Sequence, residues 1–181
     1  MILIVNNNII TPWELKFLSL LKKKINKSEL KEIFKISNII EEYLNQKEVN
    51  QRIQNSNVKG TDSQVIQKII EEIAIPLGFK DEKQGLFKKY KDSGLRPDFY
   101  KKIGKNGILM EVERGKTTTN NMDLLDIYKC HICEEANHLL LFVPIEVSHT
   151  KNIYKSVCKK VENFFYEENY LNIDSAIVFG Y

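Results

Sequence analysis

The sequence lacks the features of a secreted, membrane-embedded or disulfide-stabilised protein. Only three cysteines, four prolines and one tryptophan occur among its 181 residues. A small, odd number of cysteines argues against a disulfide framework, and we expect reduced thiols. The opening run MILIV is too short for a membrane span or a signal peptide, so we interpret it as a strand or a buried arm. We therefore predict a cytoplasmic protein that does not enter a membrane.

Arginine is scarce, and the common sequence motifs of nucleotide-binding proteins and of hydrolases are absent. Of the 27 basic residues, arginine occurs only at positions 52, 96 and 114. The formal net charge is +3 and the pI is about 8.6, a mildly basic balance that is compatible with nucleic-acid binding. The chain has no glycine-rich phosphate loop, no G-x-S-x-G elbow and no convincing Cys/His nucleophile pair. These absences argue against P-loop nucleotide chemistry and against acyl transfer by a serine or a cysteine.

The most informative stretch is LRPDFYKKIGKNGILMEVERGK, at residues 95–116. It predicts one strand over residues 95–103 and a second over 108–114. The turn between them contains an Asn-Gly pair, whose residues tolerate a positive φ and favour tight hairpins. Because alternate side chains of a strand share a face, Glu111 and Glu113 are expected to point to the same side of the sheet.

Carboxylates are expected to gather at one edge of this hairpin. If Ile103 pairs with Ile108 across the turn, Asp98 lies opposite Glu113. Two acids in an apolar strand are costly to bury without a cation or hydrogen-bond partners. A cluster of Asp98, Glu111 and Glu113 offers only oxygen ligands, which suit a hard divalent cation such as Mg²⁺. The sequence therefore predicts a metal site on the hairpin.

The N-terminal third is predicted to be helical. Thr11 followed by a proline forms a favourable helix start, and apolar residues then recur at helical spacing up to Ile25. A second helix restarts near Ser28 and continues to polar residues 45–62, which indicate a loop or linker. A third, strongly amphipathic helix is expected over residues 63–75.

After the hairpin, helices and apolar strands alternate. Asn120 or Asn121 is expected to cap a helix. The run HLLLFVP at residues 138–144 is typical of a strand that is buried on both faces. Thr150 is then expected to cap another helix, and SAIVFG at residues 175–180 to form a last strand. The residues of the first of these helices predicted to face the core are Met122, Leu125, Tyr128, Ile132 and Cys133.

This order of elements indicates an α/β fold with a central mixed sheet flanked by helices. Strands that alternate with helices imply right-handed crossovers onto one sheet. Residues 1–60 are predicted to form an N-terminal helical extension that dimerises or contacts DNA. Residues 61–181 are predicted to form the core.

Pro97-Asp98, followed after the turn by Glu111-Val112-Glu113, resembles the metal-binding motif of the PD-(D/E)XK nuclease superfamily. Glu113 stands where that motif usually has lysine, as in the E-X-E form found among some type II restriction endonucleases. The order of elements around the hairpin is also similar to that of the family. The resemblance implies a restriction-endonuclease-like core.

The resemblance also implies roles for individual residues. Asp98 and Glu111 would hold the principal metal ion together with the carbonyl of Val112. Glu72, on the helix before the hairpin, would add a carboxylate to the metal site; the alternative is an exposed side chain on an amphipathic helix. Glu113 would act as a base or bind a second ion.

Residues beyond the second strand are expected to face the substrate. Lys116 is the candidate for a displaced catalytic lysine, although Arg114 and Lys116 are equally explained as solvated charges at a strand end. Residues 80–94 are predicted to form a mobile loop or short strand near the substrate. The residues expected to contact DNA are Arg96, Arg114, Lys116, Thr117, Thr118, Thr119, Asn120 and Asn121.

The function implied by the resemblance is Mg²⁺-dependent DNA cleavage, with Mn²⁺ expected to replace Mg²⁺. A type II restriction enzyme that cuts double-stranded DNA as a homodimer is the main prediction. Two alternatives stay open on the same fold. One is a DNA-binding or assembly protein that does not cut, and the other is a nuclease of repair or mobile-element processing.

A zinc site is a competing interpretation of the second half of the chain. The residues with zinc-like spacing are Cys130, His131, Cys133 and His138. A second ligand pair would have to come from Cys158 and His149. Because Cys130 and Cys133 lie one turn apart on a predicted helix, buried thiols are the simpler explanation.

Overall fold

The computed structural model of the chain describes residues 5–6, 16–21, 25–58, 63–81, 90, 96–113, 122–147, 152–165 and 170–181. Strands in this described part are β1 (Val5–Asn6), β2 (Lys16–Leu21), β3 (Lys80–Asp81), β4 (Phe99–Ile103), β5 (Asn106–Val112), β6 (His138–Val143) and β7 (Ser175–Gly180). Helices are α1 (Lys27–Leu44), α2 (Lys47–Ser56), α3 (Ser63–Ala74), α5 (Met122–Ile132) and α6 (Ile153–Phe164).

These strands form one mixed sheet in the order β1-β2-β7-β6-β5-β4-β3. The central strands β5, β6 and β7 are parallel, whereas the remaining pairs are antiparallel. β6 and β7 are buried along their whole length, as is usual for parallel strands that are covered on both faces. The predicted α/β class with a central mixed sheet is confirmed.

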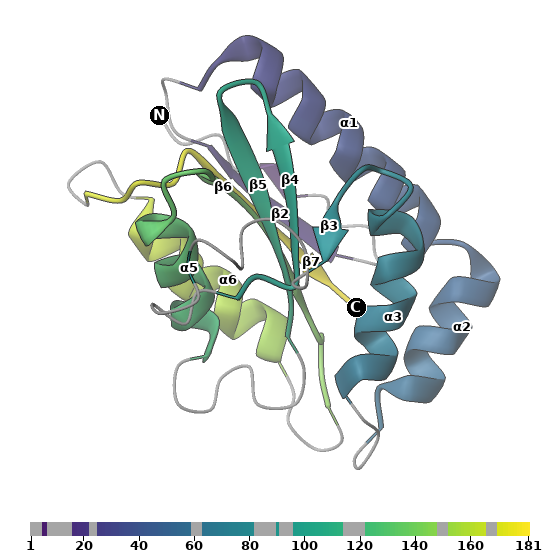
Figure 1. Ribbon diagram of the computed structural model, residues 1–181. Helices are drawn as coiled ribbons and strands as arrows, with labels where there is room; N and C mark the ends of the chain where they lie inside the picture. The colour runs from purple at the N-terminus through teal and green to yellow at the C-terminus, as the bar shows by residue number, and fades with distance from the viewer. Residues whose placement is uncertain are drawn as a thin grey trace.

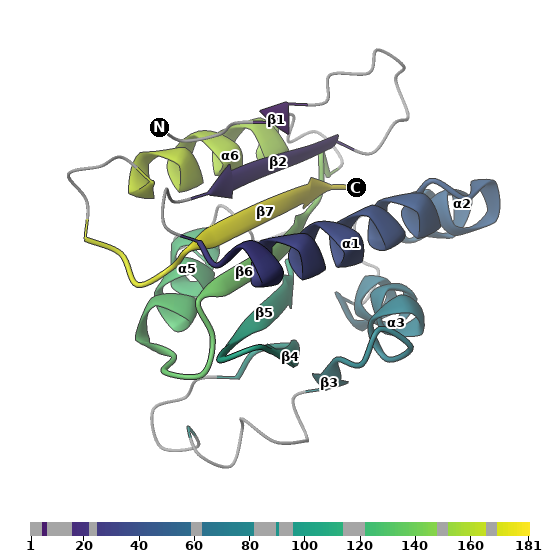
Figure 2. The same cartoon turned by 90° about the horizontal axis from the view of Figure 1, so that it is seen from above.

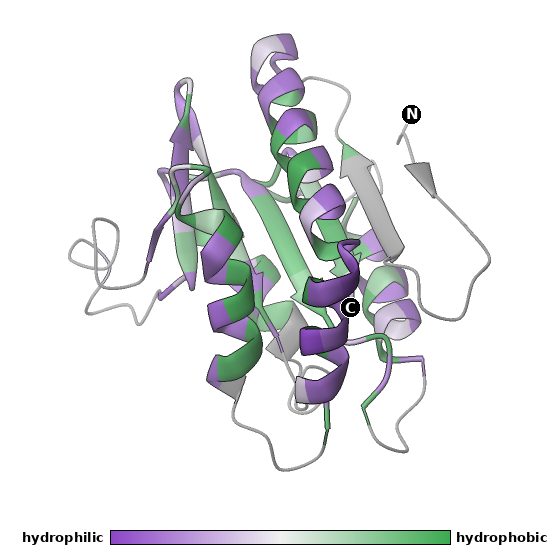
Figure 3. Cartoon of the chain, turned by 90° about the vertical axis from the view of Figure 1, so that its right-hand side faces the viewer, coloured by the Kyte–Doolittle hydropathy of each residue, from purple (hydrophilic) through white to green (hydrophobic). Residues whose placement is uncertain are grey.

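Helices cover both faces of the sheet (Figure 1 and Figure 2). α5 and α6 pack on one face, and their core includes Leu109 and Val157. α1, α2 and α3 pack on the other face, where Ile66 and Met110 are buried. Figure 3 shows green, apolar strands behind helices that alternate between green and purple. Each helix therefore turns an apolar stripe to the sheet and a polar one to the outside.

Strand β5 alternates as the sequence predicted. Leu109 lies in the core under α5 and α6, whereas Ile108 and Met110 lie in the core under α1 and α3. The period of two then places Glu111 on the same side as Leu109. The acidic side chain of β5 therefore faces α5.

The predicted hairpin register is wrong. Ile103 pairs with Asn106 rather than with Ile108, because the turn contains only Gly104 and Lys105. Gly104 has a φ of 51°, and glycine at the first central position is typical of a type II′ turn. The Asn-Gly pair that suggested the turn lies at the start of β5.

The corrected register changes which carboxylates meet. Phe99 pairs with Met110, so the preceding residue, Asp98, lies across from Glu111 instead of Glu113. A shift of two residues keeps every side chain on its predicted face, because the strand period is two. The predicted face of β5 is thus retained, while the partner of Asp98 changes.

Two segments near the N-terminus also differ from the prediction. Residues 16–21 form strand β2 instead of a helix, because they pair along their length with β7 and pairing in the sheet overrides local helix propensity. α2 forms where a polar loop was predicted. Only Val49 and Ile53 are buried on α2, so its amphipathic pattern is short and weak. α1 begins at Lys27, close to the predicted restart near Ser28, and Asn26 caps it by accepting a hydrogen bond from the Ser28 amide at 2.9 Å.

Helix α5 turns a different face to the sheet from the predicted one. Leu125 and Tyr128 are 43% and 55% exposed, whereas Asp126, Ile127 and Cys130 are buried. The prediction that Leu125 and Tyr128 face the core is wrong because the helix directs Asp126 toward the end of β5. At about 100° per residue, Leu125 and Tyr128 then point away from that site.

The described part of residues 1–60 contributes β1 and β2 to the same sheet as residues 61–181, so this segment is not purely helical. α1 and α2 also share one apolar core with α3.

Helix α6 spans Ile153–Phe164. It is shorter than expected, and Thr150, its predicted cap, lies outside the described residues. Among the described helices, none combines the length and apolar character needed to cross a lipid bilayer.

Candidate active site

The candidate site lies at the carboxyl end of β5, on the sheet face that α5 covers. Its central residue is Glu111, which pairs with Leu141 of β6 and is only 2% exposed. A carboxylate in such a place needs a cation or hydrogen-bond donors, because its desolvation is costly. The cation comes from α5, where Lys129 Nζ lies 3.2 Å from Glu111 Oε1.

A second carboxylate shares this ammonium group. Asp126, one turn before Lys129 on α5, is fully buried, and its Oδ1 accepts a hydrogen bond from Lys129 Nζ at 2.8 Å. Burial alone would lower the pKa of Lys129, but the charges of Glu111 and Asp126 outweigh it and raise that pKa. Lys129 is therefore a permanent cation between two buried acids.

Asp98 is held by three neighbours at the start of β4. Its Oδ1 accepts a hydrogen bond from Gln67 Nε2 at 3.1 Å, and its Oδ2 accepts one from the Val112 amide at 2.7 Å. The Asp98 amide in turn donates to Glu111 Oε2 at 3.3 Å. The carboxylate of Asp98 is thus fixed against the end of β5 by backbone and side-chain donors.

Glu113 follows the last residue of β5 and is half-buried. Its amide donates to the carbonyl of Phe142 at 2.8 Å. Burial, and then the neighbouring Asp126 through its charge and a hydrogen bond, raise the pKa of Glu113 to about 8. Two carboxyl groups in contact retain a proton, since both cannot ionise cheaply. Glu113 therefore holds its proton to a higher pH than an ordinary glutamate.

Glu111 also holds its proton more tightly than an ordinary glutamate. Burial raises the pKa of Glu111 well above its usual range, and the charges of Asp126 and Asp98 add to this. Lys129 opposes the shift. Strongly shifted pKa values in one cluster are typical of functional sites, because catalysis requires groups that exchange protons near neutral pH.

Glu72 is not brought to this cluster. Its Oε2 accepts hydrogen bonds from Arg52 Nη1 and from the Tyr43 hydroxyl, both at 2.8 Å. The hydrogen bond from Arg52 lowers the pKa of Glu72 to about 2. Gln67 is the residue of α3 that contacts the site, through its hydrogen bond to Asp98. Glu72 follows five residues later on the helix, so its side chain points about 140° away from that of Gln67. The predicted role of Glu72 as a metal ligand therefore does not fit its position.

Most of the residues expected to contact DNA lie outside the described part of the chain. Arg96 is described, is exposed, and stands two residues before Asp98. Val112 is partly buried, and its amide is bound to Asp98. The residues outside the described part are Arg114, Lys116, Thr117, Thr118, Thr119, Asn120 and Asn121.

The carboxylate oxygens of Asp98 and Glu111 are ligands that suit a hard cation. Among the described residues, no group of three or more His, Cys, Asp and Glu side chains is arranged to hold a metal ion. Mg²⁺, however, is usually bound through one or two carboxylates, with water completing its six positions. Asp98 and Glu111 offer only oxygen atoms, and the Asp98 amide donates a hydrogen bond to the Glu111 carboxylate, so the two acids are neighbours at one site.

The residues with zinc-like spacing have other surroundings. Cys130 and Cys133 are buried free thiols, in line with the simpler explanation of their spacing. His131 accepts a hydrogen bond from the Asn172 amide at 3.0 Å. His138 contacts Ser175 Oγ at 2.9 Å through Nδ1. The two histidines therefore face different partners.

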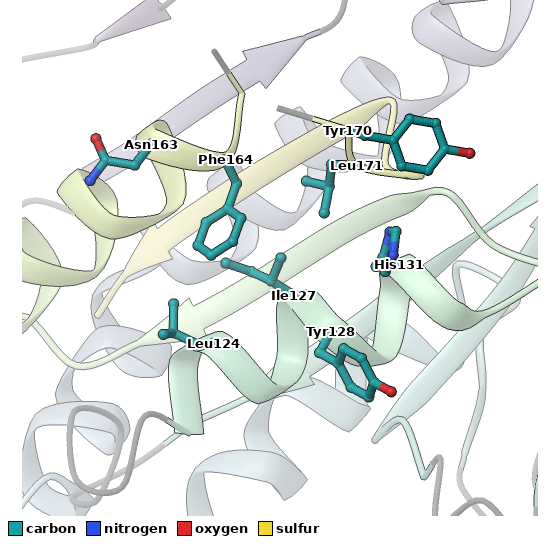
Figure 4. Close-up of a pocket in the computed structure, with 8 residues that line it drawn as sticks. All are labelled: Leu124, Ile127, Tyr128, His131, Asn163, Phe164, Tyr170 and Leu171. Atoms are coloured by element: carbon teal, nitrogen blue, oxygen red, sulfur yellow. The ribbon is translucent and has the colours of Figure 1, made fainter. Parts of the chain in front are cut away.

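A pocket of about 450 Å³ lies between α5 and α6. Ile127 and Tyr128 line it, whereas Asp126 and Lys129 point to the acidic site, so the two features use different sides of α5. The pocket is therefore separate from the carboxylate cluster. Its lining residues are Leu124, Ile127, Tyr128, His131, Asn163, Phe164, Tyr170 and Leu171 (Figure 4).

The sequence reasoning missed Asp126, Lys129 and Gln67. A signal for the first two was present, since they are oppositely charged residues three apart on a helix. The pair was overlooked because Leu125 and Tyr128 were taken as the buried face of the helix, which placed Asp126 and Lys129 on the exposed side. Gln67 carries no charge, so nothing in its pattern distinguishes it from a solvent-exposed helix residue.

No family model, no curated protein sequence and no solved structure matches the chain.

Proposed function

We propose that this protein is a Mg²⁺-dependent endodeoxyribonuclease of the PD-(D/E)XK type. The observation that carries the proposal is the buried cluster at the end of β5, where Lys129 lies between Glu111 and Asp126 and Asp98 is bound to Glu111. Ligands of α/β folds commonly bind outside the carboxyl ends of parallel strands, which is where this cluster lies.

Asp98 and Glu111 are the residues that would hold the metal ion. When bound, Mg²⁺ would neutralise charge that develops on the phosphate and lower the pKa of a coordinated water. The protein's own contribution is to fix the two carboxylates. Gln67 and the Val112 amide orient Asp98, and the Asp98 amide orients Glu111.

Lys129 would take the role of the lysine that the E-X-E motif lacks. In the family, that lysine orients the attacking water. Here Glu113 takes the motif position, and an ammonium group reaches Glu111 from α5 at 3.2 Å. Because Glu111 and Asp126 hold it charged, Lys129 would orient a nucleophile or stabilise a negative oxygen.

Glu113 would act as the proton-transfer group. Its pKa of about 8, raised by burial and by Asp126, lies close to neutral pH, where a general acid or base works best. As a base, it would have to lose its proton first. A cation bound nearby would favour this loss, since opposite charge stabilises the carboxylate.

The substrate in this proposal is double-stranded DNA, and a type II restriction enzyme acting as a homodimer is the specific form we favour. Arg96, which is exposed and stands two residues before Asp98, and the lysine-rich composition support contact with phosphate groups. Phosphate contacts of this kind position a duplex but do not read its sequence.

Plasmid cleavage tests the proposal directly. Purified protein is incubated with supercoiled DNA and Mg²⁺, with and without EDTA, and we expect cleavage that EDTA abolishes. Glu111→Gln should lower the rate by roughly 10²-fold or more, beyond the loss typical of an outer partner of a metal site. Glu48→Gln, at an exposed position of α2, is the matched control and should cut like the wild type.

Two results would count against the proposal. Wild-type cleavage by Glu111→Gln would show that the cluster is not the active site. Tight DNA binding by a wild-type protein that cuts neither methylated nor unmethylated DNA with Mg²⁺ or Mn²⁺ would favour the non-cutting alternative.

A further inference from the structure

The pocket between α5 and α6 has the size of a small-molecule site. Its volume is about 450 Å³, within the range of roughly 300–1,000 Å³ that is usual for ligand pockets. Ile127 and Leu171 are buried in it, and Figure 4 shows the Phe164 ring directed toward Ile127. None of the described residues that line it is a carboxylate, a lysine or an arginine. The pocket therefore suits an uncharged ligand, because a charge without a partner is costly to bury.

His131 supplies a fixed hydrogen-bond donor in this pocket. The Asn172 amide donates to His131 Nδ1 at 3.0 Å, and Asn172 Nδ2 donates to the His131 carbonyl at 3.5 Å. A ring nitrogen that accepts a hydrogen bond carries no hydrogen, so the imidazole has its N–H at Nε2. Among the contacts of the described residues, none uses this Nε2. The donor therefore pairs with an acceptor on the ligand.

Two exposed aromatic rings flank this donor. Tyr128 is 55% exposed and Tyr170 is 92% exposed, and Figure 4 shows them on either side of His131. The rings of Tyr170 and His131 meet edge to face, with centroids 6.4 Å apart and planes at 86°. An aromatic face that remains in water at the mouth of a pocket is a surface on which a flat ring stacks. The rim formed by Tyr128 and Tyr170 thus favours a planar ligand over an aliphatic one.

We propose that this pocket binds a nucleobase, which stacks on the tyrosine rim and accepts a hydrogen bond from His131 Nε2. A nucleobase combines the three required properties. It is uncharged, it is planar, and its edge carries ring-nitrogen and carbonyl acceptors. The pocket lies on the other side of α5 from the carboxylate cluster, so this inference goes beyond the proposed nuclease function and does not depend on it.

Isothermal titration calorimetry with adenosine, in a buffer without divalent cations, tests the proposal on the wild-type protein. We expect a Kd on the order of 0.1 mM, as is ordinary for a ligand of this size. Ribose, which lacks the base, should not bind. Absence of adenosine binding at millimolar concentration would overturn the proposal, whatever the outcome of a cleavage assay.

Variants show whether adenosine occupies this pocket. The double variant Tyr128→Leu with Tyr170→Leu keeps apolar side chains but removes both rings, and it should raise the Kd about 10-fold, as expected when base stacking is lost. His131→Asn keeps an oxygen acceptor for the Asn172 amide but removes the Nε2 donor, so adenosine should bind about fivefold more weakly. Leu125→Ala, at an exposed position of α5 outside the lining, is the matched control and should bind like the wild type.

Two further results would count against the assignment. Unchanged adenosine affinity in both the double variant and His131→Asn would place the ligand elsewhere on the protein. Indole has a flat ring but no acceptor on its edge, so His131→Asn should leave its affinity unchanged. An equal loss for indole and adenosine would mean that the substitution distorts the pocket, and the hydrogen bond would be withdrawn.

A nucleobase can reach the pocket in a free nucleoside or in an unpaired strand. A single-stranded adenine oligonucleotide, titrated beside adenosine, distinguishes these sources. Tighter binding of the oligonucleotide, lost in the double variant, would identify the strand, whereas tighter binding of adenosine would identify the nucleoside; both results support a nucleobase pocket. Because no step of this test requires DNA cleavage, failure of the nuclease proposal would leave its result intact.

Discussion

Asp98 and Glu111 are bound to each other just past the Phe99–Met110 end of the β4–β5 ladder. The Asp98 amide donates to Glu111 Oε2 at 3.3 Å, while Asp98 Oδ2 accepts a hydrogen bond from the amide of Val112, the residue after Glu111, at 2.7 Å. Each acid is therefore oriented by the strand that carries the other. This arrangement depends on the two-residue turn, because a turn two residues longer would bring Glu113 opposite Asp98.

Lys129 should be essential for the stability of the metal-free protein. Lys129→Met keeps the aliphatic stem but leaves Glu111 and Asp126 buried without their cation. Breaking a buried ion pair in this way typically costs about 3–5 kcal/mol. Urea denaturation at neutral pH measures the loss. The cost should shrink in acid, since a protonated carboxyl no longer needs a cation.

The control for Lys129→Met is Lys159→Met, at an exposed position of α6, which should change stability very little. Equal stability of Lys129→Met and the wild type at neutral pH would mean that the acids are neutral without the ammonium group. Lys129 would then not be the cation of the site.

A buried contact at the other end of β5 should hold the hairpin to α1. Glu29 is 4% exposed, and its carboxylate accepts hydrogen bonds from the Lys105 amide at 3.2 Å and from Asn106 Nδ2 at 2.9 Å. Glu29→Ala leaves these donors unpaired, at a cost of about 1–3 kcal/mol for a buried polar group. Urea melts compared with those of Glu32→Ala, a half-buried acid on the same helix, measure the difference. A loss no larger than that of Glu32→Ala would contradict the contact.

Strong local patterns allowed the sequence to predict much of the fold. The apolar runs of β6 and β7 could be read as strands because every position in them is buried. The face of β5 that carries Glu111 followed from the strand period, although the predicted register placed Asp98 opposite Glu113 instead of Glu111. Those predictions depended on residues close together in the chain, whose spacing is fixed by covalent geometry.

The errors arose where distant residues decide the structure. β2 is a strand because β7 lies beside it, and the hairpin register follows a turn that competes with the Asn-Gly pair. Asp126 and Lys129 were missed because a search for the buried face of a helix looks for apolar residues. Here that face carries charged residues, which form an ion pair with each other. Sequence rules fail at such places because contacts between distant segments override local preference.

Stability should fall with rising pH because of Glu113. Its folded pKa is about 8, raised by burial and by Asp126, whereas an unfolded glutamate titrates near pH 4.3. Between these values the folded state binds the extra proton, so unfolding becomes easier as pH rises. One proton corresponds to at most about 1.4 kcal/mol per pH unit, and solvent screening reduces the slope for this half-buried group.

Glu113→Gln should remove that slope. The mutant and the wild type are compared by urea denaturation from pH 5 to about pH 8, the window set by the two pKa values. Glu111 and His138 titrate in both proteins, so their effects cancel in the difference. The mutant should gain stability relative to the wild type as pH increases. Parallel curves would mean that Glu113 titrates normally, and its role as a proton-transfer group would be withdrawn.

Divalent cations should stabilise the protein, and more strongly at higher pH. A ligand that binds only the folded state raises stability by about 1.4 kcal/mol for each tenfold increase above its Kd. Mg²⁺ or Mn²⁺ must displace protons from the acids that receive it. Burial raises the pKa values of Glu111 and Glu113, so the cation competes with fewer protons at pH 8 than at pH 6. Melting temperature, followed over millimolar Mg²⁺ at both pH values, provides the measurement.

Variants locate the site of this stabilisation. Glu111→Gln should lose most of the increment in melting temperature, because it removes a charged oxygen donor from the pair with Asp98. Glu72→Gln should retain it, since Glu72 is bound to Arg52 and Tyr43 on another part of the protein. An increment that disappears in Glu72→Gln and persists in Glu111→Gln would place the cation at α3. Absence of any increment in the wild type with either ion would remove the metal from the proposed mechanism and leave Lys129 as the only cation of the cluster among the described residues.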